Sequence, residues 1–130
     1  MFDSTSGATG WLSIVAIITS LAIGIWLRRF QKAPALIRRM RPHYILGYAA
    51  LALAGVHTIL AMGAVKQAGS TGIQFATAAL LSLGLQTFVG ASLQDPGGYR
   101  RALRVCHIGI VVVLAIALLV HVTLDGDLVL

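Results

Sequence analysis

Two stretches of equal length decide how this chain folds: HYILGYAALALAGVH at residues 43–57 and HIGIVVVLAIALLVH at residues 107–121. Each is almost entirely apolar and has a histidine at both ends, so its two histidines are fourteen residues apart. Fourteen residues of an α-helix make nearly four full turns and rise about 21 Å. Each stretch therefore predicts a helix that carries both of its imidazoles on one face.

The composition of the whole chain is typical of a membrane protein, with 58% hydrophobic and only 11% charged residues. A helix needs about 20 apolar residues to cross a bilayer, and runs of that length are too long for strands. Four segments meet this requirement: residues 11–27, 44–65, 72–93 and 105–124. The sequence predicts an all-α fold, a four-helix transmembrane bundle that forms one integral membrane domain over residues 1–130.

The distribution of the basic residues predicts how the bundle is oriented. The net charge is +6, and nine of the ten Lys and Arg residues lie in two of the predicted loops. Such a bias marks cytoplasmic loops, so we expect both termini outside, in a bacterial inner membrane. Because these cations border predicted spans, we expect anionic lipid headgroups and not nucleic acid as their partners. The nine are Arg28, Arg29, Lys32, Arg38, Arg39 and Arg41 in the first loop, and Arg100, Arg101 and Arg104 in the third.

This orientation arranges the four histidines in two pairs. The second and fourth predicted helices both begin at the cytoplasmic side, so they run parallel. Pro42 suits the first turn of a helix, which places His43 near the inner surface. His43 and His107 are then at the inner end, and His57 and His121 are nearer the outer end.

Paired imidazoles on two helices suit the coordination of haem iron, which takes two axial ligands from opposite faces of the porphyrin. We expect His43 and His107 to bind the iron of an inner haem, and His57 and His121 that of an outer haem. Two histidine ligands leave no position for oxygen, so the pattern favours electron transfer over oxygen activation. It predicts no catalytic residue and indicates a subunit of an oxidoreductase complex, not an enzyme by itself.

With these helices and histidines, the chain resembles the four-helix di-haem core of the membrane cytochrome b family, and it is also similar to ferric reductase-like transmembrane haem domains. The resemblance implies two b-type haems, with small residues on the first and third helices where the haems come close. Gly10 and Gly24 are fourteen residues apart on the first helix, and Ala76 and Gly90 on the third. Glycine would allow a flat macrocycle to approach the backbone.

Other residues suggest how the haem propionates would be bound and with what partners the haems would exchange electrons. Haem propionates are anions, and Arg41 and Arg104 could bind those of the inner haem, with Arg28 and Arg29 as further candidates. The chain contains no G-x-G-x-x-G fingerprint for a nicotinamide or flavin cofactor. We therefore expect electrons to pass between a quinone pool and a partner redox protein. Cys106 is the single cysteine, and we expect it to be a small buried packing residue.

Two alternatives remain open at this point. A small four-helix transporter would have a similar length, but none of the four predicted spans contains the Asp or Glu that cation transport would be expected to use. A structural subunit of a larger membrane complex could bind single pigments through its histidines. Separate pigment sites would not require the two helices to match in spacing or direction.

Overall fold

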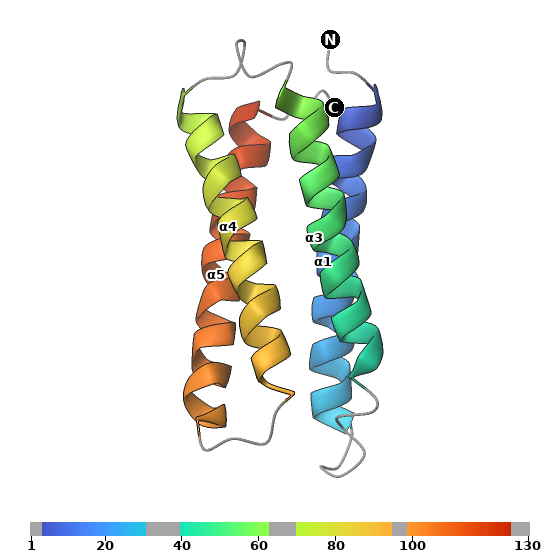
Figure 1. The fold of residues 1–130 in the computed structure, drawn as a ribbon, viewed down its shortest axis with the longest axis vertical. Coiled ribbons are helices and arrows are strands. Elements are labelled where there is room, and N and C mark those ends of the chain that lie inside the picture. Colours follow the sequence, from blue (N-terminus) through green and yellow to red (C-terminus); the bar gives the residue numbers. More distant parts are fainter. Residues whose placement is uncertain (1–3, 31–39, 63–69, 95–98, 126–130) are drawn as a thin grey trace. The chain divides into compact units, whose positions relative to one another are not determined.

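The structure is a computed structural model that describes residues 4–30, 40–62, 70–94 and 99–125 (Figure 1). Within these described ranges it contains four helices and no strand. Each helix is long and apolar enough to cross a membrane, which confirms the predicted all-α class and the four predicted spans. The helices are α1 (Ser4–Phe30), α3 (Arg41–Ala61), α4 (Ser70–Ser92) and α5 (Arg100–Asp125).

The helices differ from the predicted spans mainly at their ends. α1 begins at Ser4 and not at residue 11, and α5 begins at Arg100 and not at residue 105. The length of an apolar run predicts only the part of a helix that crosses the hydrocarbon core of a bilayer. The helical backbone continues beyond it through polar residues near the membrane surface. α3 has Pro42 as its second residue, which confirms that His43 lies in the first turn. The predicted end of the second span, residue 65, lies outside the described residues.

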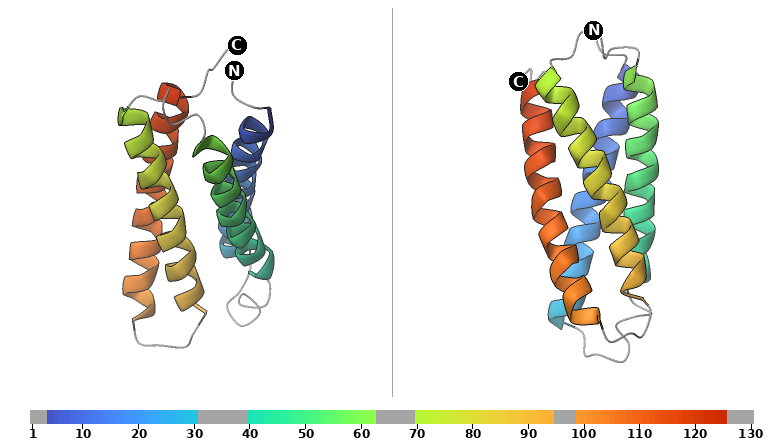
Figure 2. Two further views of the ribbon diagram at one scale, coloured as in Figure 1. Left: turned by 45° about the horizontal axis from the view of Figure 1, so that its top comes forward. Right: turned by 60° about the vertical axis from the view of Figure 1, so that its left-hand side comes forward.

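The chain consists of two compact units, Met1–Leu60 and Ala61–Leu130. The first contains nearly all of α1 and α3, and the second contains α4 and α5. Within each unit the two helices run antiparallel, as Figures 1 and 2 show. We call these units the α1–α3 hairpin and the α4–α5 hairpin and describe each separately.

Small polar residues pack the α1–α3 hairpin. Ser6, Ser13 and Ser20 are buried at intervals of seven residues along α1. The hydroxyl of Ser13 donates a hydrogen bond to the carbonyl oxygen of Ala50 on α3 at 3.1 Å, and Ala50 is fully buried. A seven-residue repeat keeps one helix face toward a neighbour, and small side chains there let two backbones approach closely. These serines therefore define the face of α1 that packs against α3.

The α4–α5 hairpin has a more apolar core. Ala79, Leu83 and Val89 are buried on α4, and Leu114 and Ala117 are buried on α5. Leu114 is seven residues from His107, which is also buried, so one face of α5 carries both. The buried face of α5 thus includes the first histidine of the 107–121 stretch.

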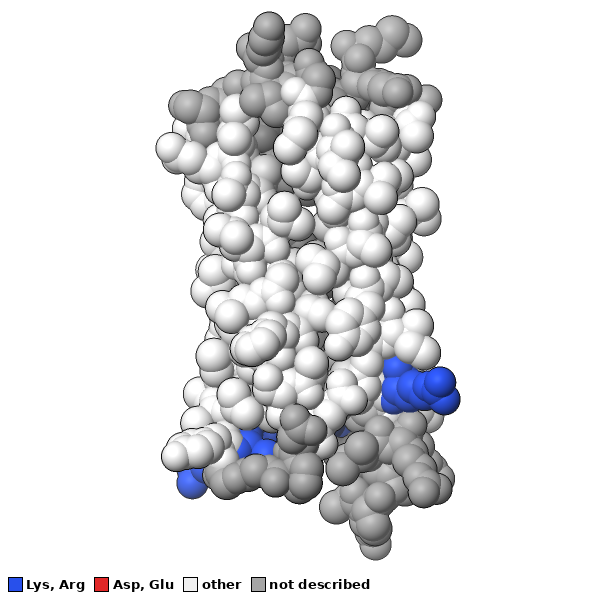
Figure 3. Space-filling view, viewed as in Figure 1, with Lys and Arg blue, Asp and Glu red and all other residues white. Residues whose placement is uncertain are grey.

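The outer surfaces of the helices are apolar, as contact with lipid requires. Large hydrophobic side chains are widely exposed, among them Ile59 (68%), Leu81 (68%) and Phe88 (70%). In water such a surface would favour association, whereas in a bilayer it faces lipid. On the face that Figure 3 shows, no charged side chain is visible over the middle of the helices. The described cations all lie within five residues of an end of α1, α3 or α5: Arg28, Arg29, Arg41, Arg100, Arg101 and Arg104.

Candidate functional site

His57 is held against α1 by a backbone carbonyl and a glycine. Its Nδ1 lies 2.8 Å from the carbonyl oxygen of Ser6. A Cβ atom added to Gly10 would lie only 3.0 Å from both Cε1 and Nδ1 of the ring. The imidazole therefore lies directly over the backbone of α1, in a place that opens because residue 10 has no side chain.

His43 repeats this arrangement near the other end of the hairpin. Its Nδ1 lies 2.8 Å from the carbonyl oxygen of Ser20 and 2.9 Å from the Ser20 hydroxyl oxygen. The Ser20 hydroxyl in turn donates to the carbonyl oxygen of His43 at 3.0 Å. A Cβ atom on Gly24 would lie 3.2 Å from Nδ1 and 3.3 Å from Cε1 of the ring. The first turn of α3 is thus bound to α1 by both the side chain and the backbone of His43.

The two arrangements have the same spacing on both helices. A serine lies four residues before a glycine at 6–10 and again at 20–24, and both sets are fourteen residues apart, like the histidines. The Ser13–Ala50 hydrogen bond lies halfway between them. The glycine repeat was predicted from the sequence, but the part played by Ser6 and Ser20 was missed. The seven-residue spacing of the serines was the signal that could have revealed it.

The hydrogen bonds fix which nitrogen of each ring carries the proton. A carbonyl oxygen can only accept, so Nδ1 of His43 and of His57 must donate. In a neutral imidazole with Nδ1 protonated, the in-plane lone pair belongs to Nε2. Histidines that bind metals are commonly oriented in this way, by a hydrogen bond from one ring nitrogen that prepares the other as ligand.

His107 occupies a similar place in the α4–α5 hairpin but has a different partner. It is buried, and a Cβ atom on Gly90 would lie 3.2 Å from its Cε1. The side-chain amide nitrogen of Gln86 lies 3.0 Å from its Nε2. Gln86 precedes Gly90 by four residues, as Ser20 precedes Gly24. The corresponding position is therefore occupied by a side-chain amide, a contact that the sequence alone did not predict.

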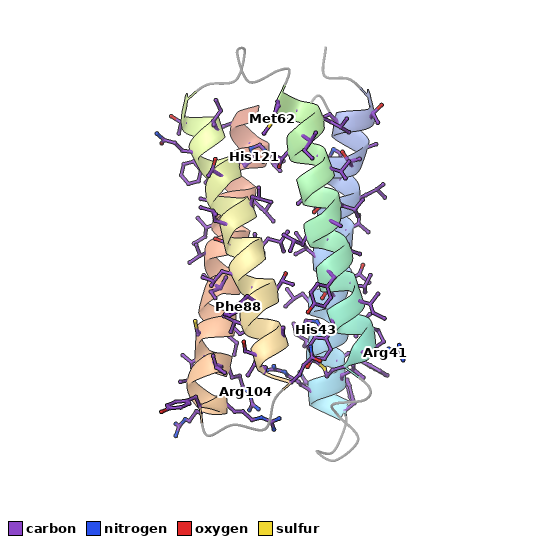
Figure 4. All side chains as sticks on the ribbon, viewed as in Figure 1. Arg41, His43, Met62, Phe88, Arg104 and His121 are labelled. Atoms are coloured by element: carbon purple, nitrogen blue, oxygen red, sulfur yellow. The ribbon has the colours of Figure 1, made fainter. Side chains whose placement is uncertain are left out.

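The remaining predicted residues lie in the following places. His121 is half-buried and lies near one end of α5, while Arg104 lies near the other end (Figure 4). His43 and Arg41 both lie in the first turn of α3. Arg41 and Arg104 are exposed. Within the hairpins the structure brings together His43 with Gly24, His57 with Gly10, and His107 with Gly90. The predicted ligand pairs each combine one histidine from either hairpin, so their pairing stays a prediction.

Two further observations concern the surroundings of His43 and His107. The rings of Tyr44 and His43 are 5.7 Å apart between centroids and tilted by 59°. Cys106 was expected to be buried, but it is exposed. One residue turns a helix by about 100°, so Cys106 lies about 100° around α5 from the buried His107 and outside the buried face. The prediction of a packing cysteine was therefore wrong.

Among the described residues, no group of three or more His, Cys, Asp or Glu side chains could hold a metal ion. A haem iron needs only two protein ligands, so this finding bears on ions held by protein side chains alone. Comparison with models of protein families, with curated proteins and with solved structures finds no match to this chain.

Proposed function

We propose that this protein is a small di-haem b-type cytochrome that carries electrons across a membrane. His43 and His107 would bind the iron of one haem, and His57 and His121 that of the other. When bound, each haem supplies an iron that takes up and releases one electron by changing between its ferric and ferrous states. The observation that carries the proposal is the repeated anchoring of His43 and His57 through Nδ1, fourteen residues apart.

This anchoring fits haem ligation because it prepares Nε2 as the electron-pair donor. Nδ1 of each ring donates to a carbonyl oxygen at 2.8 Å, so the lone pair is on Nε2. The carbonyls of Ser6 and Ser20 belong to the backbone of α1, which makes the orientation of both rings rigid. Haem iron is ordinarily bound by neutral imidazole, and a fixed tautomer lowers the entropy lost on ligation.

Histidines that only pack between helices would not require this arrangement. A histidine in a membrane helix often makes one hydrogen bond to a neighbouring helix and has no further role. Here each ring also lies against a glycine, and a glycine inside a helix costs about 0.5–1 kcal/mol relative to alanine. The same combination of carbonyl, glycine and imidazole at two matching positions supports a function common to both rings.

The charges near the histidines support haems with propionates directed to the basic end of the helices. Arg104 precedes His107 by three residues and lies on nearly the same helix face, whereas Arg41 precedes His43 by two residues and lies about 200° around the helix from it. An arginine less than one helical turn from an axial ligand can bind a propionate through charge-assisted hydrogen bonds. Arg104 would thereby hold the haem bound by His43 and His107, and Arg41 would be a second candidate whose long side chain must bend around α3.

Four apolar helices and the positive-inside rule support the location that we propose. We place the protein in a bacterial inner membrane, with the basic helix ends and connections of residues 28–43 and 94–104 on the cytoplasmic side and both termini outside. Lipid would surround the exposed apolar side chains. A quinone pool and a partner redox protein would exchange electrons with the haems, which makes the protein a subunit of an oxidoreductase complex.

The proposal is tested by counting haem in single and double histidine variants. If His57 and His121 bind the same iron, the variants His57→Ala, His121→Ala and the double variant each lose one haem, and the same one. Combining His57→Ala with His107→Ala removes both haems. The control Tyr48→Phe changes an exposed side chain on α3 and retains both. If the double variant of His57 and His121 lost both haems, the two histidines would bind different irons, and the pairing would be contradicted.

A further inference from the structure

His107 differs from His43 and His57 in which ring nitrogen is held. In His43 and His57 the hydrogen bond to α1 is made by Nδ1. In His107 the amide nitrogen of Gln86 lies 3.0 Å from Nε2. The NH2 group of a side-chain amide can donate a hydrogen bond but cannot accept one. Nε2 of His107 therefore accepts with its lone pair. The nitrogen that would bind iron is thus the one that Gln86 occupies.

We propose that Gln86 acts as a latch on His107, and that His107 must leave Gln86 before it can ligate haem. This inference rests on the proposed function. Nε2 has a single in-plane lone pair, which cannot accept a hydrogen bond and bind iron at the same time. The exchange breaks one N–H···N hydrogen bond and forms one iron–nitrogen bond, and it changes neither the number of protons nor the oxidation state of the iron.

The surroundings of Gln86 favour its release. In the described part of the chain, its amide oxygen Oε1 is buried without a hydrogen-bond partner. A buried carbonyl oxygen without a donor destabilises the position in which the amide is held. The burial of this oxygen offsets part of the free energy of the hydrogen bond to His107. Haem therefore competes with a weaker hydrogen bond than an amide with both groups paired would make.

The position of Gln86 in the fold makes the two hairpins unequal. Gln86 and Gly90 correspond in spacing to Ser20 and Gly24. In the α1–α3 hairpin, the residue four before the glycine fixes the ring through the nitrogen that ligation does not use. In the α4–α5 hairpin, it holds the nitrogen that ligation requires. Gln86 is thus a positioning residue that tunes how readily the haem site of His107 is filled.

The test compares haem binding to Gln86→Leu and to Gln74→Leu, a matched change on the exposed face of the same helix. Three full-length proteins are prepared without haem, and all carry His57→Ala so that only the His43 and His107 pair remains. One has no further change, and the other two also carry Gln86→Leu or Gln74→Leu. Titration with hemin is followed by the Soret absorbance. A hydrogen bond weakened by the unpaired Oε1 predicts that Gln86→Leu lowers the dissociation constant about two- to fivefold, whereas Gln74→Leu leaves it unchanged. An unchanged or raised dissociation constant in Gln86→Leu would overturn the latch.

A second measurement uses the natural sequence and does not depend on the folding of a variant. In the haem-free chain, nitrogen NMR of the imidazoles should show Nε2 of His107 as a hydrogen-bond acceptor. On loading with reduced haem, which is diamagnetic when bound by two histidines, the side-chain amide resonances of Gln86 should shift. Unshifted amide resonances in a haem-loaded chain overturn the latch alone. A chain that takes up no haem overturns the proposed function as well.

Discussion

Nδ1 of His43 lies 2.8 Å from the carbonyl oxygen of Ser20, so a backbone atom of α1 sets the orientation of a side chain on α3. The same relationship joins His57 to the carbonyl oxygen of Ser6. Because the acceptor is a backbone atom, substituting the serine does not remove it. The replaceable part of each arrangement is the glycine beneath the ring, Gly24 or Gly10, and Gly90 lies beneath His107 in the same way.

Gly10→Ala should weaken the haem bound by His57. The new Cβ atom would lie 3.0 Å from the imidazole, so the ring or the helix must shift. Crowding of this kind costs about 1–3 kcal/mol. Pyridine haemochrome assays on heated samples should show one haem lost at a lower temperature than in the unchanged chain. Gly7→Ala is the control on the same helix, since a Cβ atom there meets nothing within 4 Å. Equal haem retention in the two variants would disprove a role for Gly10.

Gly90→Ala should affect the other haem. Its Cβ atom would lie 3.2 Å from Cε1 of His107, whereas Gly84→Ala on the same helix introduces a Cβ atom with open space around it. We expect Gly90→Ala to weaken or shift the absorption of the haem bound by His107, with the other haem unchanged. Gly84→Ala should leave both haems unchanged. The measurement is a redox titration that resolves the two haems, and equal changes in both would speak against separate sites.

Ser13→Ala should loosen the α1–α3 hairpin without removing a haem. The buried hydroxyl of Ser13 donates to the carbonyl oxygen of Ala50, and hydrogen bonds between membrane helices contribute about 0.6 kcal/mol on average. The expected result is a small loss of stability to denaturation in detergent, with an unchanged haem count. Thr19→Ala is the control, because its exposed hydroxyl bonds to Val15 within its own helix. A loss of haem from Ser13→Ala would mean that this hydroxyl does more than join the helices.

Arg104→Gln should lower the midpoint potential of the haem bound by His107. A cation near a haem favours the reduced state, because reduction adds negative charge, so its removal makes reduction harder. Arg104 is exposed, which limits the effect to about 20–40 mV. The outer haem serves as the internal control, and its potential should remain unchanged. A potential that stays constant for both haems would place Arg104 away from the propionates.

The sequence predicted the features of the fold that depend on apolar length and residue spacing. Four helices followed from apolar length, and fourteen-residue spacing singled out Gly10, Gly24 and Gly90, which the structure places against histidines. The contact of glycine with imidazole was not foreseen, because the glycines had been assigned to a macrocycle. That assignment stays a prediction, as does the pairing of histidines from the two hairpins.

The features that the sequence did not reveal have physical reasons. The acceptors for His43 and His57 are backbone carbonyls, which every residue has, so no residue type marks them. The contact of Gln86 with His107 joins residues on different helices, and a glutamine in an apolar helix has many other uses. The error at Cys106 came from a general tendency of free cysteines to be buried, applied without the position of its neighbour His107 on the helix.

The most direct test of the central claim is the haem content of the purified chain. Protein from haem-replete cells should show a b-type reduced-minus-oxidised spectrum, and a pyridine haemochrome assay should count two haems per chain. That result would establish that the chain holds two haems, as the two proposed ligand pairs require. A chain with no haem would contradict the account and return the histidines of α3 and α5 to helix packing or proton transfer.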